Sequence, residues 1–211
     1  EIQALWFAAL RFLAEAVGGA AGEEWRKRSV QVAASISKYY VLKGRDYLSD
    51  CLHCNPGVPA SKAVPDDHLR PNQLYALTLG AFRDHRRSML ILDACSKLLI
   101  PGAIRSLADQ KTDYALAIYS SSGVLLNDPV HPYWGRYEGD EDTRRKPAYH
   151  NGTAWTWQFP AYCEAYYMIY GKAGCRTARS LLSSCSLIMN DGCISQLAEI
   201  LDGDYPHIQR G

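Results

Sequence analysis

The stretch EIQALWFAALRFLAEAVGG, residues 1–19, indicates how this chain folds. Its apolar side chains recur at the spacing of an α-helix, at Leu5, Ala9, Leu10, Leu13, Ala16 and Val17. The pair Gly18-Gly19 is typical of a helix end, and residues 23–42 then repeat the helical pattern. The sequence therefore predicts a helix over residues 1–17 and a second one directly after it.

The same periodicity continues along the chain. It predicts further helices over residues 71–82, 84–99, 160–171 and 175–190. Pro71 fits a helix start, where the missing N–H has no consequence, and Gly192 fits a left-handed cap after the last helix. Alternation typical of strands is confined to short pieces near residues 47–49 and 117–119. We therefore predict an all-α fold that forms a single domain over residues 1–211.

The composition excludes several classes of protein. Of the 211 residues, 47% are hydrophobic and 21% are charged, which is ordinary for a globular protein. The net charge of +1 offers no basic surface for nucleic acid. No apolar run reaches the roughly 18 residues of a membrane helix, and no signal peptide opens the sequence. We expect a cytoplasmic protein that binds neither nucleic acid nor membranes.

The seven cysteines do not predict a disulfide framework, because the chain is too large to depend on one. The stretch Cys51-Leu-His-Cys54 resembles half of a zinc site, but no second pair of cysteines or histidines completes four ligands. We therefore expect the thiols to be buried or without a role, and we expect no metal and no cofactor.

Two long loops separate the predicted helix pairs, at residues 51–70 and 109–159. Loops of this length in a compact domain are usually functional or disordered. The second loop is rich in aromatic residues, which disordered segments lack. These are Tyr114, Tyr119, Tyr133, Trp134, Tyr137, Tyr149, Trp155 and Trp157. Helical hairpins with ordered aromatic loops at one end favour a toroid whose site lies at the loop face.

Part of the second loop combines aromatic and hydrogen-bonding side chains. Aromatic rings stack on sugar rings, while amides, carboxylates and guanidinium groups bind the hydroxyls. The set is Trp134, Tyr137, His150, Asn151, Thr153, Trp155 and Trp157. It fits a sugar site, and it also fits aromatic filling of a core. The preceding mixed-charge run, residues 138–146, is either a solvated face or an ion-paired loop.

Glu199 and the turn Asp202-Gly203-Asp204 lie close together near the end of the sequence. A glutamate between apolar residues is most often a helix-end residue with its carboxylate in water. The functional alternative is a general base on the rim of a loop. The aspartates mark a turn first and a binding site second.

Four motifs in order resemble the amylo-α-1,6-glucosidase family, the C-terminal glucosidase domain of glycogen debranching enzymes. They are EIQALWFAAL, similar to the EINALW segment of that family, LRPNQLYALTLG, YEGDEDTRRKPAYHNGTAWTWQFP and GCISQLAEILDGDYPHIQRG. Together they cover most of the chain, and the His-Asn-Gly-Thr-x-Trp-x-Trp piece is specific. The resemblance implies an (α/α)6 barrel and an inverting glycoside hydrolase that removes α-1,6-linked glucose in glycogen catabolism.

The resemblance also implies roles for individual residues. Glu199 matches the general base of the family, although Ala198 before it departs mildly from the pattern. The remaining matches imply a glucose subsite for an α-glucan, in which the carboxylate of Glu199 faces the indoles of Trp155 and Trp157. The residues that would line this subsite are Glu1, Arg70, Asn72, Gln73, Trp134, Tyr137, His150, Asn151, Thr153, Trp155, Trp157, Asp202, Asp204 and His207.

The general acid is the problem that the resemblance raises. In the family it is an aspartate shortly before the EINALW motif, at which this sequence begins. A complete barrel needs about 400 residues at roughly 30–35 per hairpin, so we expect a partial domain, about half a toroid, without the N-terminal part and the closing C-terminal helix of the family. We expect it to be impaired in hydrolysis, and either to self-associate or to depend on the remainder of the barrel. The family gives no acid role to the internal candidates Asp66, Asp67, Asp140, Glu141 and Asp142. The alternative is a non-catalytic carbohydrate-binding or assembly module derived from the same fold.

Overall fold

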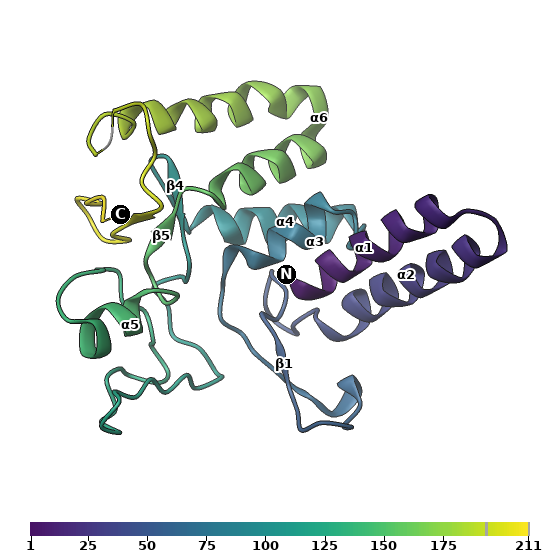
Figure 1. Cartoon of the computed structure of the whole chain (residues 1–211), viewed down its shortest axis with the longest axis horizontal. Coiled ribbons are helices and arrows are strands. Elements are labelled where there is room, and N and C mark those ends of the chain that lie inside the picture. Colours follow the sequence, from purple (N-terminus) through teal and green to yellow (C-terminus); the bar gives the residue numbers. More distant parts are fainter. Residues whose placement is uncertain (193, 211) are drawn as a thin grey trace. The chain divides into compact units, whose positions relative to one another are not determined.

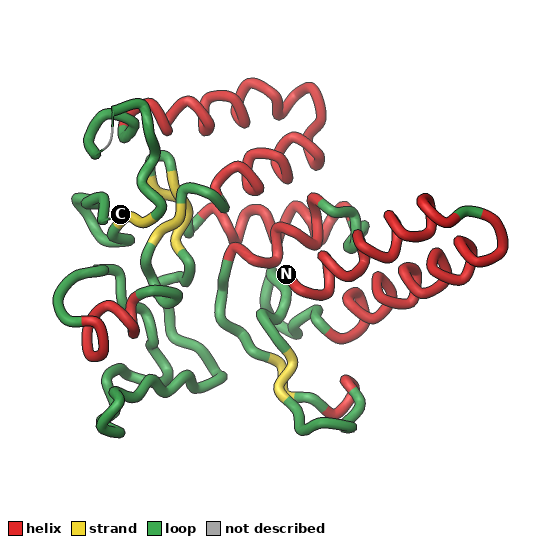
Figure 2. Tube along the Cα trace, viewed as in Figure 1, coloured by secondary structure: helices red, strands yellow, loops and turns green. Residues whose placement is uncertain are grey.

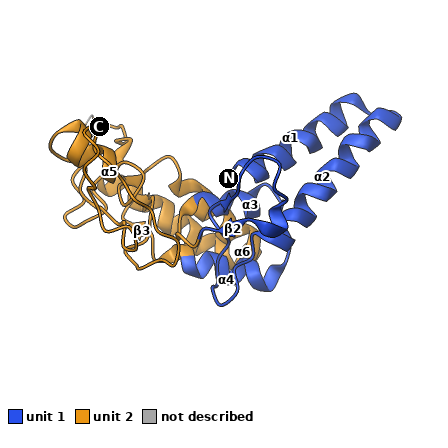
Figure 3. Ribbon diagram, turned by 90° about the horizontal axis from the view of Figure 1, so that it is seen from below, with its two compact units in different colours: residues 1–66, 72–94 blue, residues 67–71, 95–211 orange. Residues whose placement is uncertain are grey.

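The computed structural model describes residues 1–192 and 194–210 (Figure 1). Cys193 and Gly211, which the motif at residues 192–211 includes, lie outside the described residues. Helices predominate and strands are short (Figure 2). The chain divides into two compact units, one of residues Glu1–Asp66 and Asn72–Ala94, the other of residues Asp67–Pro71 and Cys95–Gly211 (Figure 3).

The first unit begins with a hairpin of two long helices, α1 (Ile2–Val17) and α2 (Gly19–Tyr39). Gly18 between them has a φ of 65°, a left-handed conformation that favours glycine. A β-carbon at Gly22 would lie 2.5 Å from the carbonyl oxygen of Ala14, so the helices approach too closely there for any other residue. Ala4, Phe7, Leu10 and Ala14 form the buried face of α1. The predicted helical hairpin is confirmed.

The remaining elements of the first unit are mostly short. The strands β1 (Leu52–His53) and β2 (Val64–Pro65) pair antiparallel, and the 3-10 helix η1 (Ala60–Lys62) lies in the loop between them. The 3-10 turn η2 (Pro71–Gln73) leads into α3 (Leu74–Thr78), and α4 (His85–Ser96) follows. One end of η2 and one end of α4 belong to the second unit. The predicted helices at residues 71–82 and 84–99 are therefore present, the first of them much shorter than predicted.

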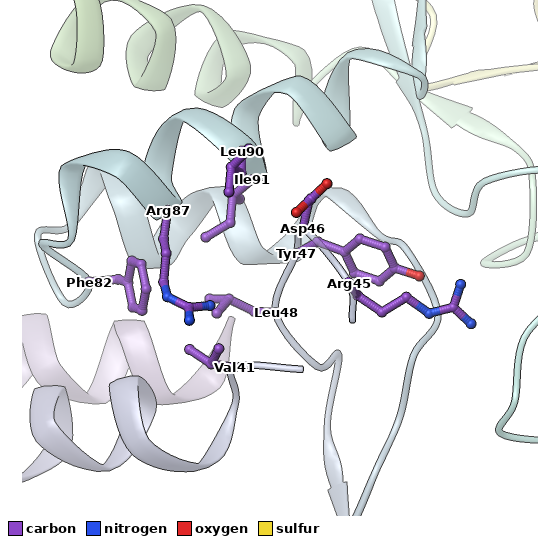
Figure 4. A pocket seen from close by; sticks show the side chains of 9 residues that line it. All are labelled: Val41, Arg45, Asp46, Tyr47, Leu48, Phe82, Arg87, Leu90 and Ile91. Carbon is purple, nitrogen blue, oxygen red and sulfur yellow. The ribbon is translucent and has the colours of Figure 1, made fainter. Parts of the chain in front are cut away.

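A small cavity lies between the loop at residues 41–48 and α4. Figure 4 shows the Arg87 side chain reaching from α4 toward Leu48, beside the ring of Phe82. The cavity measures ≈ 30 Å³, which is the volume of about one water molecule. It is too small for a sugar ring, so it is a packing feature of this unit.

The second unit is built around a four-stranded antiparallel sheet in the order β3-β4-β5-β6. The strands are β3 (Leu99–Ile100), β4 (Ala103–Arg105), β5 (Ala154–Trp155) and β6 (Ile200–Leu201). Ile100, Ala103, Ala154 and Leu201 pack together with Ile188 in its core. The all-α prediction is correct for the predominance of helices, but it did not include this sheet.

The longest helix, α6 (Phe159–Ser183), consists of two helical halves that meet at Gly171. Gly171 has φ 57° and ψ −139°, and the halves lie side by side as a hairpin (Figure 1). The 3-10 turn η4 (Ser184–Leu187) follows. Two helices meeting near residue 171 are as predicted. The predicted end near Gly192 is wrong, because α6 already ends at Ser183.

The loop predicted at residues 109–159, called the aromatic loop from here on, is ordered, although it includes β5 and its last residue, Phe159, begins α6. It contains the π-helical turn η3 (Glu141–Arg145) and α5 (Lys146–Ala148). Asp67 fastens the start of the loop, since its carboxylate accepts hydrogen bonds from the backbone N–H groups of Asp113 and Tyr114. Among residues 1–192 and 194–210, no helix combines the length and apolar character that crossing a membrane requires.

Candidate functional site

Three glycines allow three remote segments of the second unit to meet. A β-carbon at Gly203 would collide with the carbonyl oxygen of Gly152, and one at Gly135 with the carboxylate of Asp204. A β-carbon at Gly152 would lie 2.5 Å from the carbonyl oxygen of Trp134. The N–H of Gly203 donates to the carbonyl of Gly135 over 2.6 Å. The predicted aromatic loop and the Asp202-Gly203-Asp204 turn are therefore in direct backbone contact.

The sheet brings Glu199 next to the tryptophan motif, as we call the His-Asn-Gly-Thr-x-Trp-x-Trp stretch at residues 150–157. Trp155 of β5 is paired with Ile200 of β6, so Glu199 lies opposite Thr156. The N–H of Thr156 donates to the carbonyl of Glu199 over 3.4 Å, and its hydroxyl donates to the carbonyl of Ala198 over 2.7 Å. The side chain of Glu199 is exposed. The sequence motifs that suggested a base and a sugar wall are thus joined by two adjacent strands.

Aromatic rings surround this junction in one connected cluster. The ring of Trp155 lies 4.9 Å from Tyr149 in an edge-to-face arrangement, 5.6 Å from His150 in a stacked one and 6.2 Å from Trp157. Tyr137 extends the cluster through a contact of 5.6 Å with Tyr149. Trp155 is only 3% exposed, whereas Trp157 is 52% exposed. Trp155 therefore fills the core, whereas Trp157 presents an open ring to solvent, and the sugar site stays a prediction.

The acid–base properties of the cluster follow from its surroundings. Burial raises the pKa of the Tyr149 phenol, and the nearby Glu199 carboxylate raises it further. Tyr149 therefore stays protonated and can donate a hydrogen bond. Burial and the positive charge of Arg70 lower the pKa of His150, so its imidazole is neutral at pH 7. The rim of the cluster thus offers one carboxylate beside neutral donors and acceptors.

Hydrogen bonds of Arg70 and Asn151 hold the tryptophan motif in place. The guanidinium of Arg70 donates to the carbonyl oxygens of Ser106 and His150, and over 2.9 Å to the side-chain oxygen of Asn151. The amide of Asn151 in turn donates to the carbonyl of Pro147 over 2.8 Å. The predicted site residues Arg70 and Asn151 therefore make these hydrogen bonds to other residues of the chain.

Thr153 is fully buried, and its hydroxyl donates to the carbonyl of Ala148 over 2.7 Å. It ties the end of α5 to the start of β5. Its position is that of a support for the tryptophan motif.

The two aspartates of the turn are likewise engaged. Asp202 is 3% exposed and accepts from the N–H of Tyr137 over 2.8 Å and from the guanidinium of Arg210 over 2.6 Å. Asp204 accepts from the Tyr133 hydroxyl over 2.9 Å. The Nδ1 atom of His207 lies 3.2 Å from the carbonyl oxygen of Asp202. These contacts fix the turn against the aromatic loop.

The mixed-charge run is ion-paired and folded. Asp140 caps η3 by accepting from the N–H of Thr143, and Arg145 pairs with Glu141 over 2.8 Å. Asp142 accepts from the N–H of Ser121, and Lys146 lies 3.4 Å away from it.

Two arginines of the run extend to the aromatic residues that precede it. The guanidinium of Arg144 lies 5.9 Å from the ring centre of Trp134, and that of Arg145 lies 5.9 Å from the ring centre of Tyr137. Both distances are within the range of cation–π contacts. The run therefore braces the loop.

The remaining predicted site residues belong to the first unit. The side-chain oxygen of Gln73 accepts from the N–H of Leu48 over 2.9 Å, and the amide of Asn72 donates to Asp50 over 3.5 Å. Glu1 precedes α1 as its N-terminal cap residue, and its charge contributes, after burial, to a raised pKa of Tyr75.

Two tyrosines that the sequence named among the aromatic residues of the loop have further roles, since Tyr149 lies at the centre of the aromatic cluster and Tyr133 binds Asp204. Two arginines of the site were not predicted from the sequence: Arg210 binds Asp202, and the guanidinium of Arg105 donates to the carbonyl of Gly203 over 2.8 Å. Arg105 has no local sequence signal because its partner Gly203 lies 98 residues away, and Arg210 reaches Asp202, eight residues before it, only because the chain turns between them.

Comparison with known proteins identifies the family. Searches of curated proteins and of solved structures found no match. The family model described as amylo-alpha-1,6-glucosidase matches residues 1–211, including the tryptophan motif and Glu199. The chain therefore belongs to the amylo-alpha-1,6-glucosidase family.

Proposed function

We propose that the chain is a debranching-type glycoside hydrolase that inverts configuration as it releases α-1,6-linked glucose, with Glu199 as the general base. Membership of the family supports a hydrolase related to glycogen debranching and an α-glucan as its substrate. The single observation that carries the assignment is the exposed side chain of Glu199 beside Tyr149, directly before the strand that pairs with Trp155.

The proposed chemistry requires a carboxylate that water can reach. In an inverting hydrolase the base removes a proton from water as the water oxygen attacks the anomeric carbon. The glycosidic bond breaks at the same time, and its oxygen receives a proton from a separate acid roughly 6.5–9.5 Å away from the base. Exposure allows Glu199 to hold such a water, whereas the buried Asp202 is engaged by Arg210 and by the backbone of Tyr137.

The neighbours of Glu199 fit a glucose unit. The open ring of Trp157 can stack on the apolar face of the sugar, as aromatic rings do in carbohydrate sites. The neutral imidazole of His150 and the phenol of Tyr149 can exchange hydrogen bonds with its hydroxyl groups. In this proposal Thr153, Asn151 and Asp202 position the loop and do not touch the reacting atoms.

The proposal includes the fold and setting that the family resemblance implies. The α1–α2 hairpin and the two halves of α6 would be hairpins of an incomplete (α/α)6 barrel. Hydrolysis of α-1,6 bonds would place the protein in glycogen catabolism in the cytoplasm.

The test compares the wild type with Glu199→Gln on α-glucosyl fluoride. Isomaltose is the second substrate, and it should be hydrolysed much more slowly, because its leaving oxygen needs a proton from an acid to which no residue of the chain is assigned. Fluoride leaves without needing a proton, so the first substrate reports the base alone. We expect β-glucose as the first product by NMR, and a loss of at least about a hundredfold in kcat for the variant, which is the usual contribution of a general base. Glu164→Gln is the matched control, because Glu164 is an exposed glutamate of α6.

Two outcomes would contradict the proposal. Full activity of Glu199→Gln would remove the assignment of the base. Glucan binding without turnover of either substrate, abolished by Trp157→Ala, would instead identify a carbohydrate-binding module. A rescue experiment tests the role of Glu199 further. Because azide is an anionic nucleophile that needs no base, added azide should restore glucosyl transfer from α-glucosyl fluoride to a Glu199→Ala variant.

A further inference from the structure

Three metal-ligating side chains converge at the two-stranded sheet of the first unit. The Sγ of Cys51 lies 3.1 Å from the Nε2 of His53, and this nitrogen lies 3.0 Å from the Oδ2 of Asp66. The sulfur and the carboxylate oxygen are 3.9 Å apart. A sulfur, a nitrogen and an oxygen, each able to bind a metal, therefore surround one point.

The backbone explains why these side chains meet. Leu52 is paired with Pro65 and His53 with Val64, and the N–H of Asp66 donates to the carbonyl of Cys51 over 3.0 Å. Asp66 is therefore the cross-strand partner of Cys51. Cross-strand partners share a face of a sheet, as do residues two apart on one strand. The pairing thus puts Cys51, His53 and Asp66 on the same face.

Ser49 holds two of the three residues in place from beneath. Its hydroxyl donates to the carbonyl of Cys51 over 2.6 Å and accepts from the N–H of Asp66 over 2.9 Å. Ser49 and Asp66 are both buried, while Cys51 and His53 are partly exposed. The backbone of the cluster is therefore fixed by hydrogen bonds, while the thiol and the imidazole are open to solvent. A metal site needs the first for ligand orientation and the second for entry of the ion.

The distances fit a tetrahedral zinc ion. With usual zinc bond lengths and tetrahedral angles, sulfur and nitrogen are about 3.6 Å apart, nitrogen and oxygen about 3.3 Å, and sulfur and oxygen about 3.5 Å. The observed separations of 3.1, 3.0 and 3.9 Å lie within half an ångström of these values. Small rotations of the side chains would bring all three atoms to bonding distance of a common centre.

A Cys–His–Asp relay for nucleophilic catalysis fits less well. Such a relay needs one ring nitrogen of the histidine on the thiol and the other on the carboxylate. Here the same nitrogen, Nε2, lies nearest to both groups. One nitrogen carries at most one proton, whereas one metal ion can bind all three groups at once.

We propose that Cys51, His53 and Asp66 bind a zinc ion, with water as the fourth ligand. Thiolate, imidazole and carboxylate together suit zinc, while magnesium and calcium prefer oxygen alone. The ion would join β1 to β2, which are two residues long each and too short to form a stable hairpin alone. The sequence predicted no metal, because Asp66 lies 13 residues after His53 and completes the site only through strand pairing.

The test measures metal binding by the whole purified chain. After removal of metals, one equivalent of zinc should bind, as seen by competition with a chromophoric chelator and by metal analysis after dialysis. Cobalt(II) in place of zinc should show a thiolate-to-cobalt charge-transfer band and the intense visible bands of tetrahedral coordination. Zinc should also raise Tm, because it binds the folded chain. The cobalt spectrum of the wild type tests the site even if a variant fails to fold.

Variants assign the ligands. Cys51→Ser, His53→Ala and Asp66→Asn should each weaken zinc binding at least about tenfold, and Cys51→Ser should remove the charge-transfer band. Cys175→Ser is the matched control, because Cys175 is a partly exposed free thiol of α6, and it should bind zinc as the wild type does. Absence of stoichiometric zinc binding by the wild type, or equal affinity in the three ligand variants, would overturn the proposal.

Discussion

Two acidic residues near the end of the chain have opposite environments. Asp202 lies three residues after Glu199, yet its oxygens already accept from Arg210 and from the N–H of Tyr137. The ion pair with Arg210 also raises the pKa of that guanidinium. Glu199 instead has an exposed side chain near a phenol. A carboxylate that acts on water needs an oxygen that water can reach, which is why the proposed function gives the role of base to Glu199 and a positioning role to Asp202.

His150 makes the stability of the second unit depend on pH. Its pKa in the folded chain is lowered by burial and by Arg70, while the unfolded chain has the ordinary value of about 6.5. Below about pH 6.5 the imidazole of His150 binds a proton in the unfolded chain before it does so in the folded chain. The free energy of unfolding is therefore highest above about pH 6.5, and it decreases as the pH falls toward the pKa of the folded chain.

Urea unfolding of the wild type and of His150→Gln over a series of pH values tests this expectation. The variant should lose less stability than the wild type as the pH falls from 7 to 5, because glutamine does not titrate. Identical pH dependences for the two proteins would show that the imidazole takes up its proton equally easily in both states.

At the scale of elements, very short strands are held together by close backbone contacts. β5 and β6 are two residues long each, and the segment that precedes β5 meets the segment that follows β6 at Gly152 and Gly203. Gly203 donates to Gly135 and accepts from the guanidinium of Arg105. This point therefore links the sheet, the aromatic loop and the turn that follows Glu199.

Gly203→Ala should disrupt this link for a purely steric reason, because its β-carbon would collide with the backbone of Gly152. Backbone adjustment of this kind typically costs about 1–3 kcal/mol in the free energy of unfolding. We expect that loss in urea unfolding, together with faster amide exchange at Thr156, whose N–H binds Glu199.

Gly192→Ala is the control for this prediction. The nearest atom to its β-carbon would be the end of the flexible Gln209 side chain, 3.2 Å away. The Gly192→Ala variant should leave the amide hydrogen exchange at Thr156 unchanged. Equal stability of the two glycine variants would mean that the chain relaxes around residue 203 without cost.

The elements also explain what the sequence could and could not reveal. The α1–α2 hairpin and the break of α6 at Gly171 follow from local signals, namely apolar periodicity and glycine. The four-stranded sheet does not, because two-residue strands leave no alternation to detect and Trp155 pairs with Ile200 far along the chain. Similarly, the motif around Glu199 was identified through family resemblance, whereas the partners Arg105 and Arg210 and the joining of Asp66 to Cys51 depend on tertiary pairing.

At the scale of the whole molecule, α1 presents a second apolar face. Beyond the buried face that includes Phe7 and Leu10, Ile2 is 72% exposed and Phe12 is 74% exposed. Leu5 and Ala9, also exposed, lie between them in sequence, so the stripe has the spacing of a helix that pairs with another helix. An exposed apolar stripe of this kind usually marks an interaction surface, and the occupant that we expect is the same stripe of a second copy.

We therefore predict concentration-dependent self-association through α1, measured by sedimentation velocity. Ile2→Ser combined with Phe12→Ser should shift the protein toward monomer without lowering Tm, because neither side chain belongs to the buried face. Val124→Ser is the control, since Val124 is an exposed apolar residue of the aromatic loop, and it should associate as the wild type does. A wild type that sediments as a monomer at every concentration would contradict the prediction and would leave the exposed face of α1 as a solvated surface.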